Sequence, residues 1–546
     1  MQDELIARAK AWLAEDPDTD TREELAKLID AEDTAELTAR FTGTLQFGTA
    51  GLRGELGAGP MRMNRAVVIR AAAGLAAYLK AQGVTDGLVV IGYDARHKSA
   101  DFARDTAAVM TGAGLRAAVL PRPLPTPVLA YAIRHLGAVA GVEVTASHNP
   151  PRDNGCKVYL GDGSQIVPPA DAEIAAEIAA VARLADVPRP DSGWQTLDEG
   201  VLNAYLERTD AVLAPGSPRT ARTVYTAMHG VGTETLLAAF ERAGFPAPVL
   251  VAEQAEPDPD FPTVAFPNPE EPGAMDLAFA KARETDPDLI IANDPDADRC
   301  AAAVKDGGNG GDWRMLRGDE VGALLAAHLV RRGARGTFAE SIVSSSLLGR
   351  IAEKAGLAYE ETLTGFKWIA RVEGLRYGYE EALGYCVDPD GVRDKDGITA
   401  ALAVTELASE LKAEGRTLLD LLDDLAVEHG LHATDQLSVR VDDLSVISDA
   451  MRRLREQPPT RLAGLPVTRT EDLALGTDLL PPTDGLRYTL DGARVIVRPS
   501  GTEPKLKCYL EVVVPVGTHD GLPAARAKAT ELLAEIKRDL SAVAGI

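Results

Sequence analysis

The sequence is poor in cysteine and has no long hydrophobic run. Its four cysteines lie far apart along 546 residues, without the close spacing of a zinc or redox motif. This favours reduced thiols over a disulfide framework. No run approaches about 18 uncharged apolar residues, the length of a membrane span. Asp3 and Glu4 stand where an export signal needs positive charge. We therefore expect a cytoplasmic protein without a membrane partner.

Basic charge is scarce as well. The chain has 57 Lys and Arg against 82 Asp and Glu, a net charge of −25. Nucleic acids and anionic membranes bind basic faces, so the composition excludes both as main partners. A small anion held by a few local Arg and Lys side chains remains compatible with this charge. The phosphate-binding pattern GxxxxGK[ST] is absent too, which leaves a P-loop kinase unsupported.

Apolar runs that alternate with helical stretches dominate the first 430 residues. Such alternation is typical of α/β domains, and a chain of this length forms about three to five domains. Residues 1–40 predict two helices, the second opened by the capping box Thr21-x-x-Glu24. After about residue 430, short strands and a final helix over 522–540 predict an α+β unit. We therefore predict three α/β domains and a smaller α+β C-terminal domain. The predicted boundaries are 1–208, 209–316, 317–432 and 433–546.

The first polar motif, Thr145-Ala-Ser-His-Asn-Pro150, follows the apolar run GAVAGVEV. A serine at such a strand end, beside His148, is a candidate nucleophile. Ser, Asn and Pro are also common in turns and helix caps. Taken alone, the short motif favours a turn or cap over a nucleophile. Lys157 lies close enough in sequence to reach the same site.

The second motif, Asp294-Pro-Asp-Ala-Asp-Arg299, follows the apolar strand LIIAN. On an extended loop, Asp294, Asp296 and Asp298 can converge on one hard cation. The alternative is a solvated acidic turn, but ligand loops in α/β sheets emerge where strands end. Three carboxylates leave positions open for a phosphate oxygen, which favours Mg²⁺.

The third motif, Arg498-Pro-Ser-Gly-Thr-Glu-Pro-Lys505, gathers the donors that suit a phosphate dianion. A plain Pro/Gly hairpin turn is the alternative. A fourth, weaker motif is Gly378-Tyr-Glu-Glu-Ala-Leu-Gly-Tyr385, whose carboxylates could bind sugar hydroxyls. Downstream, Arg393-Asp-Lys-Asp-Gly397 adds further cationic donors.

Together these motifs resemble those of the α-D-phosphohexomutase family, the phosphoglucomutases and phosphomannomutases. TASHNP, DPDADR, GYEEALG and RPSGTEPK occur in the family's order and at its separations, and FGTAGLRG at 47–54 extends the match. MHGVG (228–232) and TGFKWI (364–369) point to the branch that includes phosphopentomutases. The resemblance implies three α/β domains with mixed sheets and a smaller fourth domain around a central cleft.

The resemblance also implies roles for individual residues. Ser147 would carry a phosphoryl group and, with Asp294, Asp296 and Asp298, would hold Mg²⁺. The remaining residues expected at the reacting centre are Arg53, His148, Lys157 and Arg299. Those expected to bind substrate are Glu380, Lys367, Lys395, Arg498, Ser500, Gly501, Thr502 and Lys505.

The implied activity is exchange of phosphate between positions 1 and 6 of a sugar, such as glucose, through phosphoserine and a bisphosphate intermediate. A sugar 1,6-bisphosphate would act as activator, and the enzyme would be a monomer or homodimer. Lys157 and then His148 are the candidate general bases. Many members read Glu-x-Ser in the sugar loop, whereas this chain has Ala382. That leaves a phosphopentomutase acting on ribose or deoxyribose phosphates as the alternative. A metal-dependent phosphatase and a non-catalytic sugar-phosphate sensor are more distant alternatives.

Overall fold

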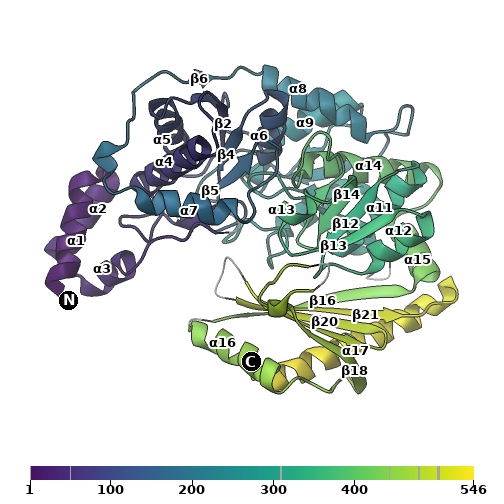
Figure 1. The fold of residues 1–546 in the computed structure, drawn as a ribbon. Coiled ribbons are helices and arrows are strands. Elements are labelled where there is room, and N and C mark those ends of the chain that lie inside the picture. Colours follow the sequence, from purple (N-terminus) through teal and green to yellow (C-terminus); the bar gives the residue numbers. More distant parts are fainter. Residues whose placement is uncertain (1, 49–50, 308–309, 442, 478–479, 501–504) are drawn as a thin grey trace. The chain divides into compact units, whose positions relative to one another are not determined.

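The structure is a computed structural model. It describes residues 1–546 except 1, 49–50, 308–309, 442, 478–479 and 501–504. The chain divides into two compact units, Met1–Met315 with Gly384–Ser409, and Leu316–Leu383 with Glu410–Ile546. Each unit is built from two sheets with their helices (Figure 1).

The first sheet of unit 1 has the order β1-β5-β4-β2-β3-β6. Strands β4, β2, β3 and β6 run parallel, whereas β5 is antiparallel to both β4 and β1. Helix α5 contacts β2 and β3, and α6 contacts β2 and β4. The elements are β1 (Leu52–Glu55), α4 (Arg65–Ala81), β2 (Leu88–Tyr93), α5 (Ser99–Gly112), β3 (Arg116–Val119), α6 (Thr126–His135), β4 (Ala140–Val144), β5 (Asp153–Leu160), α7 (Ala170–Ala180), β6 (Gln195–Thr196) and α8 (Gly200–Thr209).

The second sheet of unit 1 is mixed in the same way, with the order β11-β10-β9-β7-β8. Strands β9, β7 and β8 are parallel to one another. Strand β10 is antiparallel to β9, and β11 is antiparallel to β10. Strand β9 is buried along its whole length, as expected for a central parallel strand. The elements are β7 (Thr223–Thr226), α9 (Gly232–Ala243), β8 (Val249–Leu250), α10 (Asp276–Thr285), β9 (Leu289–Ala292), β10 (Ala301–Asp306) and β11 (Asp312–Met315). Unit 1 also contains β15 (Gly384–Cys386), which is not a strand of this sheet, and the start of α14 (Gly397–Ala413).

Unit 2 begins with a parallel arrangement in which β12 lies between β13 and β14. Strand β12 is buried over its last four residues, and helix α12 contacts both β12 and β13. The elements are α11 (Gly318–Arg331), β12 (Thr337–Ser341), α12 (Leu347–Ala355), β13 (Ala358–Thr362), α13 (Phe366–Ile369), β14 (Leu375–Glu380) and α15 (Leu418–His429).

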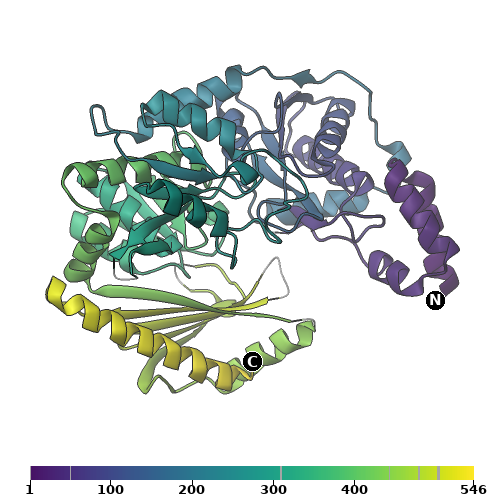
Figure 2. The same cartoon turned by 180° about the vertical axis from the view of Figure 1, so that it is seen from behind.

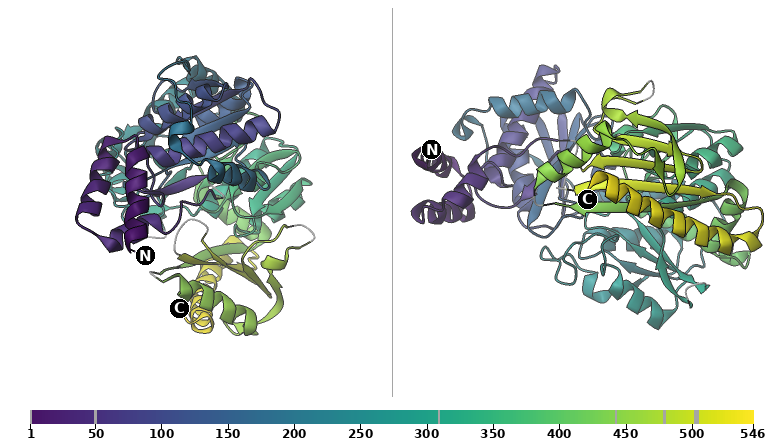
Figure 3. Two further views of the ribbon diagram at one scale, coloured as in Figure 1. Left: turned by 60° about the vertical axis from the view of Figure 1, so that its left-hand side comes forward. Right: turned by 90° about the horizontal axis from the view of Figure 1, so that it is seen from below.

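The C-terminal sheet differs from the others because all its described strand pairs are antiparallel, in the order β16-β21-β20-β19-β18-β17. Helices α16 and α17 lie on one side of it (Figures 1 and 3), and their apolar faces join its core. The elements are β16 (Leu431–Arg440), α16 (Leu444–Glu456), β17 (Arg461–Leu462), β18 (Leu465–Asp472), β19 (Leu486–Leu490), β20 (Ala493–Pro499), β21 (Lys505–Val514) and α17 (Leu522–Ala544).

The N-terminal segment departs from the prediction. It forms three helices instead of two: α1 (Gln2–Glu15), α2 (Thr19–Asp30) and α3 (Thr34–Phe41). The predicted capping box is also wrong, because Asp18 caps α2 with a side-chain hydrogen bond from Asp20 N. Thr21 lies inside the helix, and its hydroxyl donates to Asp16 Oδ2 at 2.8 Å.

The predicted fold class is confirmed: α/β architecture in three domains and an antiparallel C-terminal sheet with helices. All four cysteines are buried, and none forms a disulfide. Among the residues that the structure describes, no helix combines the length and apolar character needed to cross a membrane.

Candidate active site

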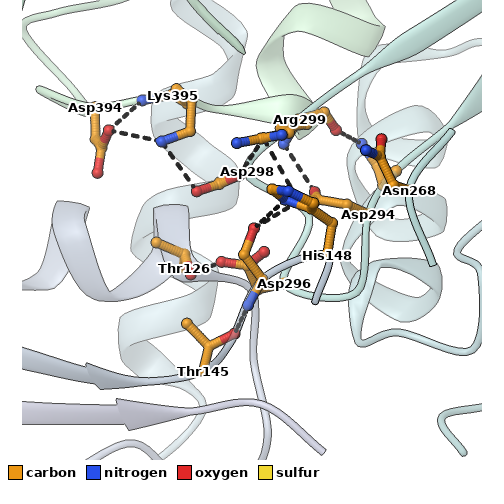
Figure 4. Close-up of polar contacts among 12 residues, drawn as sticks. Thr126, Thr145, His148, Asn268, Asp294, Asp296, Asp298, Arg299, Asp394 and Lys395 are labelled. Atoms are coloured by element: carbon orange, nitrogen blue, oxygen red, sulfur yellow. Dashed lines mark hydrogen bonds and ion pairs between the residues drawn. The ribbon is translucent and has the colours of Figure 1, made fainter. Parts of the chain in front are cut away.

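Three carboxylates converge in the loop that follows β9. Asp294, Asp296 and Asp298 are all fully buried, and each places an oxygen within 4.8 Å of the others. Figure 4 shows these side chains together with His148 and Arg299. Burying three carboxylates side by side is costly unless cations compensate them. The cluster is therefore not the solvated acidic turn that the sequence left open.

Two glycines hold the backbone of this acidic loop in place. A Cβ on Gly230 would lie 2.3 Å from Pro295 Cα, and a Cβ on Gly397 would lie 2.2 Å from Arg299 O. Only glycine permits such close approach. Inside the loop, Ala297 has a φ of 53°, a conformation that non-glycine residues adopt rarely.

Ser147 lies on the turn after β4 and contacts this loop. Its hydroxyl donates to Asp294 Oδ2 at 3.0 Å and lies 3.2 Å from His148 Nδ1. The residue is only 3% exposed and has a φ of 53°, stabilised by a 2.8 Å hydrogen bond from its N–H to Thr145 Oγ1. A strained serine that points at a carboxylate cluster is typical of a functional site rather than a simple turn.

Arg96 holds the serine turn in place, and the sequence motifs missed this residue. Its guanidinium donates to the carbonyls of Ser147 at 2.6 Å, Asn149 at 2.7 Å and Pro150 at 2.8 Å. The rule that ligand residues follow strand ends could have identified it, because Arg96 comes three residues after β2.

Arg53, at the start of the first sheet, also reaches the serine turn. Its Nη1 donates to Asn149 Oδ1 at 3.0 Å. Burial and the nearby Arg299 lower the pKa of Arg53 below its ordinary value. Because guanidinium groups titrate far above neutral pH, the side chain still carries its charge.

Three cationic side chains compensate the carboxylates. Lys157 Nζ lies 2.6 Å from both Asp296 Oδ2 and Asp298 Oδ2. Lys395 Nζ lies 3.2 Å from Asp298 Oδ2, and Arg299 Nε lies 3.9 Å from Asp298 Oδ1. The structure thus brings the predicted Lys157, Arg299 and Lys395 to one cluster, whose formal charge is close to zero.

The mutual fields of these groups shift their pKa values. Burial alone would lower the pKa of Lys157, but Asp296 and Asp298 outweigh burial and raise it. Burial would raise the pKa of Asp298, but Lys157 and Lys395 outweigh it and lower it. Burial and the two neighbouring carboxylates raise the pKa of Asp294 well above its ordinary range.

The donor set fits a divalent cation. Asp296 Oδ1 and Asp298 Oδ1 are buried and accept no hydrogen bond from any residue that the structure describes. Oxygen donors of this kind suit Mg²⁺. The other oxygen of Asp296 accepts a 2.5 Å hydrogen bond from Thr126 Oγ1. The two residues are 170 positions apart, and no sequence pattern predicted this contact. The group Asp294, Asp296 and Asp298 could therefore bind a metal ion.

In unit 2, two residues predicted to bind substrate are Glu380 and Lys367. Glu380 ends β14, and its Oε1 accepts a 2.7 Å hydrogen bond from Gly365 N, at the turn that leads into α13. Lys367 lies in α13 and is 3% exposed. The next carboxylate, Glu381, accepts from the hydroxyls of Ser341 and Ser344 at 3.2 and 3.3 Å.

The described parts of the predicted phosphate motif are residues 498–500, at the end of β20, and Lys505, at the start of β21. Ser500 N donates to Lys505 O at 2.8 Å, whereas the predicted Gly501 and Thr502 lie outside the described residues. Arg498 pairs across the sheet with Lys507, and Lys505 pairs with Arg440. Like charges directly opposite each other destabilise a sheet, so an anion would relieve this cluster. Lys507 and Arg440 were not identified from the sequence.

Comparisons with known proteins agree with this geometry. The family descriptions "Phosphoglucomutase/phosphomannomutase, alpha/beta/alpha domain" I, II and III match residues 44–184, 203–308 and 317–428. The corresponding "C-terminal domain" matches 437–522.

Individual proteins resemble the whole chain as well. A Haemophilus influenzae protein named "Probable phosphomannomutase" is 52% identical over 459 residues, which cover 83% of this chain and 93% of that protein. The "Phosphopentomutase" of Mus musculus is 34% identical and covers 93% of this chain and 90% of its own length. A phosphoglucomutase/phosphomannomutase family protein from Burkholderia thailandensis shares the fold, with a TM-score of 0.70 at 19% identity over 91% of this chain and 97% of that one.

Proposed function

Because the chain belongs to the phosphoglucomutase/phosphomannomutase family, we propose that it interconverts glucose 1-phosphate and glucose 6-phosphate through phosphoserine at Ser147 and a bisphosphate intermediate. One observation carries this proposal: the buried Ser147 hydroxyl lies 3.0 Å from a carboxylate of an acidic cluster that has cations on its other side. Such a hydroxyl can accept and return a phosphoryl group without leaving the site.

In the first half-reaction, the bond between phosphorus and Ser147 Oγ breaks and a bond to a free sugar hydroxyl forms. The hydroxyl proton passes to a base, and Ser147 Oγ takes up a proton. The second half-reaction reverses these steps with the other phosphate. The proposed acceptor of the sugar hydroxyl proton is His148 Nδ1, 3.2 Å from Ser147 Oγ. Lys157, whose pKa Asp296 and Asp298 raise so that it stays protonated, is the proposed proton donor to Ser147 Oγ.

Charge balance supports the pairing of Mg²⁺ with phosphoserine. Three carboxylates face Lys157, Lys395 and Arg299, so the cluster is already near neutral. A phosphoserine adds a charge of about −1.5 to −2 at neutral pH, and a divalent cation held by Asp294, Asp296 and Asp298 offsets it. When bound there, Mg²⁺ would reduce the negative charge on the transferring oxygens.

Unit 2 would bind the rest of the substrate. We propose that Arg498, Ser500 and Lys505, with Gly501 and Thr502, hold the phosphate that does not react. Glu380 and Lys367 would contact the sugar hydroxyls. Lys395 would bind substrate through the same cationic cluster that compensates Asp298. The sugar 1,6-bisphosphate activator, the monomeric or dimeric state and the cytoplasmic location stay predictions.

Phosphopentomutase activity is the second candidate, and two observations favour it. Relatives named phosphopentomutase align with 93% of the chain. In addition, Ala382 follows Glu381 in the sugar loop, and Ala cannot make the hydrogen bonds that a hydroxyl would make at that position.

The deciding experiment compares kcat/KM for glucose 1-phosphate, mannose 1-phosphate and ribose 1-phosphate, each primed by the corresponding bisphosphate, with products identified by NMR. The proposal expects the highest value with glucose 1-phosphate. A preference for ribose 1-phosphate would replace it by the phosphopentomutase alternative. Release of inorganic phosphate instead of an isomeric product would contradict both.

A further inference from the structure

Unit 1 contains a cavity of about 660 Å³ that lies outside the acidic site. Residues of α1, the segment 43–47 after α3, α4 and α7 line it. The first 43 residues precede the region that matches the family's domain I, and their helices pack on a small core that also includes Ala58. Figure 2 shows these helices, in purple, as a separate group. The cavity therefore lies where this N-terminal segment meets the first α/β domain.

The cavity has the size and lining of a small-molecule site. Its volume falls in the range of ligand pockets, about 300–1,000 Å³. The apolar part of its wall comprises side chains from both the N-terminal segment and the α/β domain: Trp12, Phe41, Leu45, Phe47, Leu52, Val67, Ile178 and Leu184. Such a wall suits a flat apolar body of one or two rings.

Arg70 supplies an unsatisfied donor to this wall. Its Nη1 donates to Val181 O at 2.5 Å, but its buried Nε–H has no hydrogen-bond acceptor among the described residues. The guanidinium also lies 5.9 Å from the centre of the Trp12 ring. A buried donor without an acceptor is unfavourable, and a bound acceptor would satisfy it.

The charges around the cavity favour an anion. Glu15 is 3.9 Å from Arg70, but it also accepts from Leu184 N at 2.9 Å and from Arg183 Nε at 3.4 Å. Asp16 is the second carboxylate of the lining, and it accepts hydrogen bonds from Asp18 N and from the Thr21 hydroxyl. Arg8 is exposed, also lines the cavity, and makes no ion pair with the part of the chain that the structure describes. The cavity is thus lined by two guanidinium groups and two carboxylates, and both carboxylates already accept hydrogen bonds, whereas the Arg70 Nε–H is left to an anionic ligand.

We propose that this cavity is a binding site for a small amphipathic acid, with an aromatic or other apolar body and one carboxylate or sulfonate group held by Arg70. The body would stack in the apolar wall next to Trp12, and the acidic group would accept the Arg70 Nε–H bond. The site is separate from the acidic cluster and does not depend on the proposed reaction.

The test uses 8-anilinonaphthalene-1-sulfonate, whose fluorescence rises in apolar surroundings, titrated into the full-length protein. We expect one saturable site per chain. The carboxylate 2-naphthoate should displace the probe, whereas the neutral 2-naphthamide should compete at least about tenfold more weakly, because a charge-assisted hydrogen bond is lost. Equal competition by acid and amide would overturn the assignment of an anion site.

Variants of cavity residues test whether the probe binds in this cavity. Arg70→Met should weaken its binding at least about tenfold, and Ala175→Phe should fill the cavity and abolish binding. The matched controls are Arg104→Met, on the exposed side of α5, and Ala176→Phe, exposed on the same helix as Ala175 but outside the lining. Thermal unfolding and phosphosugar turnover would verify that each variant is folded. Wild-type probe affinity in both folded cavity variants, or displacement of the probe by glucose 1,6-bisphosphate, would contradict the proposal.

Discussion

The Ser147 hydroxyl donates a 3.0 Å hydrogen bond to Asp294 Oδ2 across 147 residues of sequence. The two residues lie in loops that follow strands of different sheets: Ser147 follows β4 and Asp294 follows β9. A contact between two strand-end loops of separate domains is hard to explain as a local turn or cap. It places a hydroxyl beside a carboxylate cluster that could bind a metal ion.

Replacing this hydroxyl provides the first prediction. Ser147→Ala should lower mutase turnover at least about a thousandfold, because the proposed covalent carrier is lost. Intact-mass measurement should show that the mass of one phosphoryl group is gained by the wild type after incubation with the bisphosphate and not by the variant. Ser445→Ala, on the exposed surface of α16, is the control and should behave as the wild type. Substantial turnover by a folded Ser147→Ala protein would exclude Ser147 as the carrier.

The sequence predicted the residues that would carry the chemistry of this site better than the residues that hold them in position. Ser147 and the Asp triplet could be found because each follows an apolar strand, where the ends of parallel strands place polar loops together. Thr126 could not be found, because its contact with Asp296 depends on how two domains pack. Arg96 follows a strand end as well, so the same rule could have identified its position, but its role in binding backbone carbonyls could not be predicted from the sequence.

The C-terminal domain shows the same limit for secondary structure. Strand β16 (Leu431–Arg440) carries an apolar alternation that Asp435 interrupts, and it pairs along its whole length with β21. The segment 474–480 resembles a strand in composition, but residues Leu473–Leu475 form a 3₁₀ turn, and 478–479 lie outside the described residues. Composition alone therefore does not distinguish a turn from a strand, because strand formation depends on pairing and packing with distant residues.

Asp296→Asn should weaken Mg²⁺ binding at least about tenfold, because it replaces a carboxylate ligand by a neutral amide. Calorimetric titration of Mg²⁺ and the Mg²⁺ dependence of turnover would measure the effect. Asp286→Asn, an exposed residue of the same domain that pairs with Lys305, is the matched control. Unchanged Mg²⁺ affinity in a folded Asp296→Asn variant would remove Asp296 from the ligand set.

Gly230→Ala tests the support of the acidic loop. The new Cβ would lie 2.3 Å from Pro295 Cα, so the backbone must shift. Overpacking of this kind costs about 1–3 kcal/mol, and we expect a lower melting temperature together with weaker Mg²⁺ binding. Gly307→Ala is the control, because nothing lies within 4 Å of a Cβ at that position. Wild-type Mg²⁺ affinity in Gly230→Ala would show that the loop does not depend on this contact.

Arg498→Ala tests the proposed phosphate cradle. Arg498 and Lys507 stand opposite each other on neighbouring strands, so removing one charge should stabilise the free sheet slightly while weakening anion binding. Loss of a hydrogen bond to a charged group, about 1.5–3 kcal/mol, should raise KM for the phosphosugar by about tenfold or more. Arg498→Lys should recover part of the loss, and Arg452→Ala, exposed on α16, should change nothing. An unchanged KM in Arg498→Ala would contradict the cradle assignment.

The last prediction concerns pH. Asp396 is buried and accepts hydrogen bonds from the Tyr205 hydroxyl at 2.9 and 3.0 Å and from the N–H groups of Ile398 and Thr399 at 3.0 Å. Burial raises its pKa from the ordinary value of 3.8 to about 6. Between these two values the folded state therefore binds more protons at this group than the unfolded state does.

It follows that the contribution of Asp396 to the free energy of unfolding is greatest at low pH and falls as the pH rises through this window. Asp396→Asn removes the titrating group and keeps an acceptor oxygen for the N–H groups. Relative to wild type, the melting temperature of the variant should therefore rise between about pH 4 and about pH 6.5 and level off above that. Asp191→Asn, at an exposed position, controls for the loss of one formal charge and should show a constant difference from wild type. A constant difference for Asp396→Asn as well would mean that burial does not raise the pKa of this carboxyl.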